Sequence, residues 1–187
     1  MAHLGTCKLS TAVLICGAFT ALALSSFAAA EEPGAESFEG VCELSGAIRH
    51  QPPLSGVPAP TKVHGSFSGT CSGELTDRDG RTRRLDRAPA AYEARGFGEL
   101  ACLGGTATGT GRLLFGSGQE IQFSLTERRP GPGLAVVTLE GAAGGSATVL
   151  GTVSPSEDLV EADERCNGSG LRLVRGDARI VSLGISG

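Results

Sequence analysis

Histidine is the side chain best suited to acid–base and metal chemistry near neutral pH, and this chain has three: His3, His50 and His64. A hydrolytic triad needs a base beside an activated nucleophile. The string HGSFSG around His64 has Phe67 where the nucleophile motif G-x-S-x-G requires serine. A zinc site needs three or more ligands close together, and no motif of that kind occurs in the sequence. The sequence therefore predicts no catalytic residue, no metal site and no cofactor.

Two short motifs could hold a ligand. Asp77-x-Asp79-Gly80 opens like a calcium-binding loop but lacks the later acids and the distal glutamate, so it is better explained as a hairpin turn. Arg175-Gly176-Asp177 is the tripeptide that adhesive proteins display to integrins, and we expect it at a hairpin tip. No spacing of acids singles out a pair for glycoside hydrolysis. A chain with no Trp and one Tyr also offers little for a sugar ring to stack on.

Charged residues form two clusters of opposite sign. The basic cluster surrounds the Asp-Gly turn and consists of Arg78, Arg81, Arg83, Arg84 and Arg87. The acidic cluster consists of Glu157, Asp158, Glu161, Asp163 and Glu164. Solvated surfaces explain both. Two further hypotheses follow from the charges: the acidic segment docks across the arginines and plugs one end of the fold, or the arginines bind an anionic ligand such as a cell-envelope polymer.

The first thirty residues have the composition of a secretory leader. Lys8 precedes an apolar run from Ser10 to Phe27, and three alanines ending at Ala30 have the small-x-small form of a cleavage site. We expect cleavage after about Ala30, a secreted protein, and no membrane span in the mature chain. Without Lys8 the chain has 15 basic and 20 acidic residues, a net charge of −5, which argues against a nucleic-acid partner.

Four cysteines remain after the leader is removed: Cys42, Cys71, Cys102 and Cys166. An even number in an exported chain predicts two disulfides, for which three pairings are possible. The preferred pairing joins Cys42 to Cys71 and Cys102 to Cys166, because the first two fall on segments expected to be neighbouring strands. Cross-links would matter here because the predicted core is made of small residues, which bury little apolar area each.

Short β-strands separated by Gly-rich turns would position these residues. From Thr106 to Val153 the sequence predicts a four-stranded antiparallel meander, and its end predicts two strands around residues 175–177. Glycines within strands suit the bends that close a sheet. The predicted fold is therefore all-β, an antiparallel β-barrel of about 8–10 strands rather than a β-sandwich, with one short helix near 155–165.

The expected organisation is a signal peptide at 1–30, a flexible acidic lead-in at 31–37 and a single β domain at 38–187. Period-two alternation places apolar residues on one face of several strands. If the barrel is open, its lining is expected to include Ile121, Phe123, Leu125, Val136 and Leu183.

The runs GSFSGTCSGEL and CLGGTATGTGRLLF, followed by a β-rich end, resemble the uncharacterised small secreted all-β proteins of actinobacteria. The resemblance implies secretion and an all-β fold, and it implies no catalytic residue.

The leading hypothesis is a secreted, disulfide-stabilised, non-enzymatic β-protein that serves as a binding or interaction module, with a cell-envelope polymer as a candidate partner. The alternative is a lipocalin-like barrel that carries a small apolar ligand, and the third hypothesis is a hydrolase of an unrecognised type. A filled interior would favour the module and an open one the carrier. A buried carboxylate or histidine in a cleft would favour the enzyme.

Overall fold

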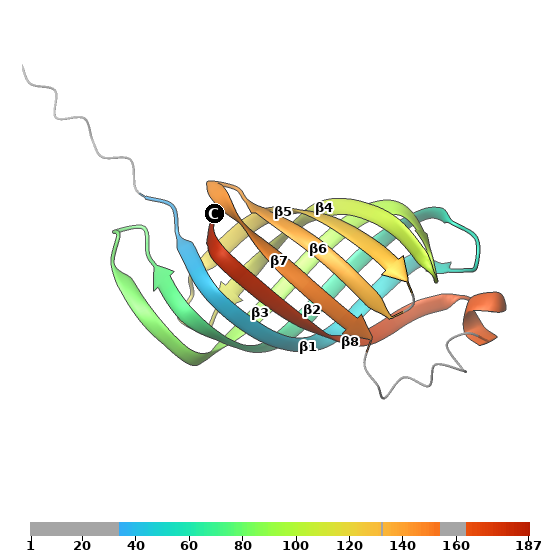
Figure 1. The fold of residues 1–187 in the computed structure, drawn as a ribbon, viewed down its shortest axis with the longest axis horizontal. Helices are drawn as coiled ribbons and strands as arrows, with labels where there is room; N and C mark the ends of the chain where they lie inside the picture. The colour runs from blue at the N-terminus through green and yellow to red at the C-terminus, as the bar shows by residue number, and fades with distance from the viewer. Residues whose placement is uncertain (1–33, 132, 154–163) are drawn as a thin grey trace, which may run out of the picture. The chain divides into compact units, whose positions relative to one another are not determined.

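The computed structural model describes residues 34–131, 133–153 and 164–187. Eight antiparallel strands form one closed barrel, in which each strand pairs with the next and the last returns to pair with the first (Figure 1). The strands are β1 Ser37–Leu54, β2 Ala59–Thr76, β3 Thr82–Ala101, β4 Gly104–Phe115, β5 Glu120–Gly131, β6 Leu134–Gly141, β7 Gly144–Val153 and β8 Leu171–Ser186. The prediction of an all-β barrel is confirmed, and the predicted four-stranded meander corresponds to β4–β7.

The β2–β3 hairpin is built on the predicted Asp-Gly turn. Gly80 has a φ of +76° and donates its amide to the Asp77 carbonyl at 2.9 Å. The Asp77 carboxylate accepts the amides of Asp79 and Arg81, each at 2.9 Å. The Asp77 carboxylate therefore serves to hold the turn together. This confirms that the motif is a hairpin turn rather than a calcium-binding loop. The hairpin extends past the neighbouring strands at the left of Figure 1.

The C-terminal segment differs from the prediction. The Arg175-Gly176-Asp177 tripeptide lies inside the continuous strand β8, paired with β1 on one side and β7 on the other. Its aspartate accepts a hydrogen bond from the Ser45 hydroxyl at 2.6 Å. The expected hairpin around 175–177 is therefore wrong, because the glycine fits within a ladder opposite Gly46 rather than at a turn.

The interior of the barrel divides into two halves along its length. The apolar half is filled by apolar side chains together with the buried Ser182, whose hydroxyl donates to the Phe38 carbonyl at 2.8 Å. The side chains with at most 2% exposure at its end include Phe38, Leu75, Ile121, Leu139 and Ile185. The rings of Phe38 and Phe115 pack there with centroids 5.2 Å apart. The polar half, at the other end, contains His50, Thr61, Glu127 and Arg129 beneath a small cluster formed by Leu54, Leu100 and Ala107.

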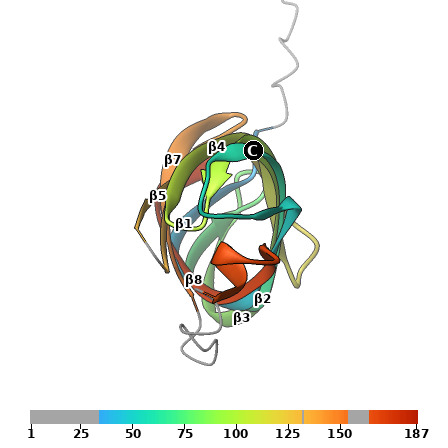
Figure 2. The same ribbon diagram turned by 90° about the vertical axis from the view of Figure 1, so that its right-hand side faces the viewer.

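Both disulfides have the pairing that the sequence favours. Cys42 and Cys71 lie opposite each other on β1 and β2 and are at most 1% exposed. Cys102, in the β3–β4 turn, joins Cys166, in a helical turn at 164–167 that precedes β8. Figure 2 looks at the end of the barrel that carries this turn. The two cross-links indicate that the chain folds in an oxidising environment.

Two further expectations concern segments that the structure describes only in part. The helical turn at 164–167 is tied to the C-terminal end of β3, whereas the arginine cluster lies at the beginning of β3, so this turn does not plug the arginine end (Figure 1). Residues 154–163 of the predicted helix lie outside the described residues. In the predicted flexible lead-in, the Glu36 carboxylate accepts the Glu120 amide at 2.8 Å and lies 3.6 Å from Arg78.

Candidate binding groove on the outer wall

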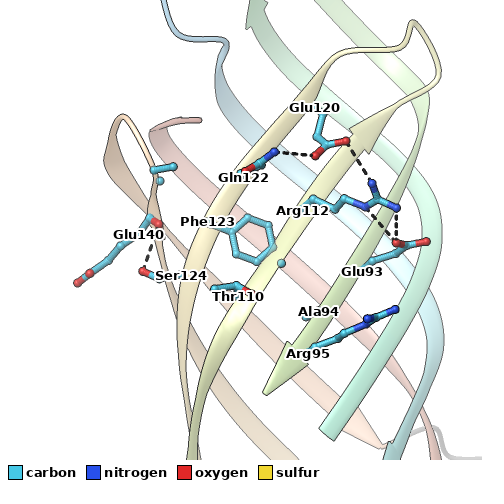
Figure 3. Close-up of a pocket in the computed structure, with 13 residues that line it drawn as sticks. Glu93, Ala94, Arg95, Thr110, Arg112, Glu120, Gln122, Phe123, Ser124 and Glu140 are labelled. Carbon is cyan, nitrogen blue, oxygen red and sulfur yellow. Dashed lines mark hydrogen bonds and ion pairs between the residues drawn. The ribbon is translucent and has the colours of Figure 1, made fainter. Parts of the chain in front are cut away.

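A groove of about 770 Å³ crosses the outer face of β3–β6 (Figure 3). Backbone of Gly111, Gly141 and Ala142 forms part of its lining. A Cβ added at Gly111 would lie 2.6 Å from the Phe123 ring, so this glycine lets β4 lie directly over the buried ring. The polar side chains along the groove are Glu93, Arg95, Thr110, Arg112, Glu120, Gln122, Ser124 and Glu140.

One guanidinium organises the charges at one end of the groove. Arg112 donates to the Glu93 carboxylate through Nε at 3.0 Å and Nη2 at 2.8 Å, and to Glu120 through Nη1 at 3.4 Å. Gln122 then donates to Glu120 at 3.2 Å (Figure 3). The hydrogen bond and the charge of Arg112 lower the pKa of Glu93. A general acid for glycoside hydrolysis needs a raised pKa, so this carboxylate is suited to binding rather than to proton donation.

A row of threonines adjoins the groove. Strand register places Thr108 opposite Thr126, Thr126 opposite Thr138, and Thr138 opposite Thr148. All four are exposed, and each lies between neighbours whose side chains face the interior or are small. Adjacent strands are about 4.8 Å apart, so the row presents a hydroxyl and a methyl at each such step. Within the described residues, none of the four hydroxyls makes a hydrogen bond.

Phe97 extends this row by one strand. It lies directly opposite Thr108 and is 56% exposed. The other aromatic side chains of the described residues, namely Phe38, Phe67, Tyr92, Phe115 and Phe123, are buried. An aromatic ring therefore lies on the outer wall at the edge of a hydroxyl-rich face, on the same face of β3 as Arg95 and Glu99.

Three buried polar residues form a chain inside the polar half. Arg129 donates to Glu127 at 2.6 Å, and its Nη2 lies 2.9 Å from His50 Nε2. Because a guanidinium can only donate, His50 Nε2 is the acceptor, which leaves the proton on Nδ1. Burial and the nearby Arg129 charge lower the pKa of His50 to about 3. Among the described residues, Nδ1 has no hydrogen-bond partner.

A small cavity of about 60 Å³ lies next to this chain, in the middle of the barrel. All eight strands contribute to its wall, and its polar lining includes Glu127 and Tyr92. Burial and the Glu127 charge raise the pKa of Tyr92. The cavity has room for about four water molecules and is well below the roughly 300–1,000 Å³ of a typical ligand site.

These buried groups are the carboxylate and histidine that would favour an enzyme. Their geometry supports a structural role, because Glu127 is held by Arg129 and a histidine with a pKa of about 3 is a weak base at neutral pH. Of the predicted lining residues, Leu125 borders the cavity, while Ile121 and Phe123 fill the core.

The other two predicted lining residues are corrected. Leu183 is 86% exposed, because Gly184, with a φ of +121°, forms a bulge that turns Ser182 and Ile185 inward instead. Val136 lies on the outer face, because the interior positions of β6 belong to Val137 and Leu139. The run AVVTL fits either alternation, so the sequence did not decide between them.

The five clustered arginines do not share one contact surface. Arg78 pairs with Glu36, Arg81 with Asp79 at 2.9 Å, and Arg83 donates to Ser117 and to Gln119. Arg84 lies opposite Glu74 across the hairpin, and Arg87, with a φ of +50°, occupies a bulge where its amide donates to Ser72. Most of these arginines therefore already contact neighbouring side chains. An anion-binding site formed by them stays a prediction.

The threonine row, the exposed Phe97 and the His50–Arg129–Glu127 chain were not predicted from the sequence. The first had a detectable signal, because TATGTG, FSLTE, VTL and SATV each place a hydroxyl residue at an outward position of a strand. Only the register brings these positions together. The buried chain joins residues 79 positions apart and has no local signal.

Within residues 34–131, 133–153 and 164–187, no helix is long and apolar enough to cross a membrane. The same part of the chain has no group of three or more His, Cys, Asp or Glu side chains that could hold a metal ion.

The fold and its cross-links define the class of protein: a closed, eight-stranded, up-and-down antiparallel β-barrel with two disulfides. Comparison with protein-family models, with curated proteins and with solved structures finds no match to this chain.

Proposed function

We propose that this protein is a secreted, non-enzymatic binding module that recognises its partner through the outer wall of the barrel. The observation that carries the proposal is the contrast between a largely filled interior and an open outer groove. The interior leaves about 60 Å³, whereas the groove across β3–β6 offers about 770 Å³ lined with hydrogen-bonding side chains.

The leader-like first thirty residues and the two disulfides support export to an oxidising compartment. A closed barrel is also a rigid base, because every strand is paired on both sides. Side chains that project from such a sheet bind with little loss of backbone freedom.

A co-sedimentation experiment with isolated cell-envelope material tests this proposal. Ser124→Arg fills the groove, and Ala135→Leu fills the interior cavity, which Ala135 lines. We expect the wild type and Ala135→Leu to sediment alike, and Ser124→Arg to bind at least tenfold more weakly. Loss of binding in Ala135→Leu alone would contradict an outer-wall site.

A second candidate function is the carrier, restricted by the cavity to a molecule of only a few heavy atoms. Native mass spectrometry of the secreted protein tests it directly. A bound mass that is lost on denaturation, and is absent from Ala135→Leu, would favour the carrier over the outer-wall module.

A further inference from the structure

We propose that the outer face of β3–β7 binds a single chain of a neutral polysaccharide along the threonine row, with Phe97 as a stacking platform. This inference rests on the proposed function and names the partner class for that wall of the barrel. The four threonines are exposed, and within the described residues their hydroxyls make no hydrogen bond.

The groove lies beside the row at β4 and β5 and adds different hydrogen-bonding groups. Thr110 and Ser124 lie opposite each other, one outward position along the strands from Thr108 and Thr126, and both line the groove. Beyond them are the amide of Gln122 and the carboxylates held by Arg112. A sugar chain along the row would thus lie over the threonine hydroxyls and have planar amide and carboxylate groups beside it in the groove, which can satisfy paired sugar hydroxyls.

Charge favours a neutral partner. The four threonines carry no charge, and in the groove the carboxylates of Glu93 and Glu120 share one guanidinium. The chain as a whole has a net charge of −4. Basic side chains beside the row are single ones, namely Lys62 opposite Phe97, Arg95 opposite Thr110 and Arg128 one outward position from Thr126. An anionic polymer would be repelled by the acidic excess, whereas a neutral one is not affected by it.

Phe97 supplies what hydroxyl groups cannot. Sugar rings have an apolar face of C–H groups, and an exposed aromatic ring offers a flat surface for that face. At 56% exposure, Phe97 keeps much of its ring in contact with water, which binding would release. Its position opposite Thr108 places it in line with the row rather than elsewhere on the barrel.

The twist of the sheet selects a single chain over a crystalline surface. Adjacent strands rotate by about 20–25°, so the row turns by roughly 60–75° from β4 to β7. A flat lattice would contact only part of such a row. A flexible polymer chain can follow it.

Affinity electrophoresis through gels containing defined polysaccharides tests the inference. The neutral probes are mixed-linkage β-glucan and glucomannan, the anionic probe is polygalacturonate, and microcrystalline cellulose serves in a parallel pull-down. We expect retardation by at least one neutral soluble probe and none by polygalacturonate. Phe97→Ala should weaken binding about tenfold, and Thr126→Val with Thr138→Val by roughly tenfold or more, since each lost hydrogen bond costs about threefold to tenfold.

Thr152→Val is the matched control, because Thr152 is an exposed threonine of β7 that lies outside the row. It should bind like the wild type. Circular dichroism and thermal unfolding must match for all variants, which valine permits because it is also β-branched. Equal binding by wild type and row variants would overturn the inference, as would retardation by polygalacturonate alone or binding to crystalline cellulose alone.

The same experiment separates this inference from the proposed function. If the protein binds envelope material but none of the neutral probes, the polysaccharide assignment falls and the outer-wall module stands. If the folded protein binds neither, both fall.

Discussion

The two halves of the barrel interior use the same eight strands to enclose opposite chemistry. In the apolar half, Phe38, Phe115 and their neighbours fill the space completely enough that side chains are at most a few per cent exposed. In the polar half, the same strands enclose an ion pair and a neutral histidine, next to the cavity in the middle of the barrel. From this difference we expect the apolar half to supply most of the free energy of unfolding. We expect the polar half to make that free energy depend on pH and on single substitutions of charged residues.

Removing one aromatic ring should show how much the apolar half contributes to the free energy of unfolding. Phe115 is 4% exposed and packs on Phe38, so Phe115→Ala should lower the free energy of unfolding by about 4 kcal/mol through lost burial and a residual cavity. Urea unfolding monitored by circular dichroism measures this change. The matched control is Phe97→Ala on the outer wall, expected to change stability by less than about 0.5 kcal/mol. Similar losses for both variants would contradict the comparison.

Breaking the ion pair tests the polar half. The Arg129 and Glu127 side chains are 11% and 7% exposed, so Arg129→Met leaves a buried carboxylate without its partner and should cost about 3 kcal/mol. The double variant Glu127→Leu with Arg129→Met removes both charges and should recover to within about 1 kcal/mol of the wild type. The same unfolding measurement distinguishes the two. A double variant as unstable as the single one would mean that the pair itself stabilises the barrel.

The pH dependence should come from His50. Its pKa is about 3 in the folded protein, well below the 6.5 of an unfolded histidine, so folding favours the neutral ring. This contribution is complete above pH 6.5 and declines as the pH falls toward 3, by about 1.5 kcal/mol between pH 6.5 and pH 5. Protonation would place a second cation beside Arg129.

Thermal unfolding from pH 7 to pH 5 for His50→Gln and His64→Gln checks this assignment. The first should lose part of the wild-type slope, and the second, an exposed histidine, should keep it. Identical slopes for all three proteins would rule out His50 as the titrating group.

The sequence predicted the strands well and their faces only in part. Regular alternation placed Ile121 and Phe123 inside correctly, because polar residues on both sides leave one face for the core. Leu183 was misplaced because a bulge at Gly184 shifts the alternation by one residue, and the sequence does not distinguish a bulge glycine from a turn glycine. The same ambiguity produced the false hairpin at Gly176.

The candidate sites were harder to predict, because they exist only in the closed sheet. The threonine row needs the register of four strands, and each threonine alone is an ordinary exposed strand residue. The contact between Arg129 and His50 requires the barrel to close, so that β5 and β1 face each other across the interior. The disulfides were predictable because cysteine pairing carries its own chemistry.

The pairing of β8 with β1 has a consequence for how the chain acquires its structure. Ser37 lies opposite Ser186. The outer edge of β1 therefore stays unpaired until β8, the last strand, has been synthesised. Until then both outer strands present unpaired amides and carbonyls, which are templates for aggregation. Contacts of such long sequence separation also form slowly. A chain that must cross a membrane before it folds would benefit from this delay, because the barrel cannot close while its last strand is still missing.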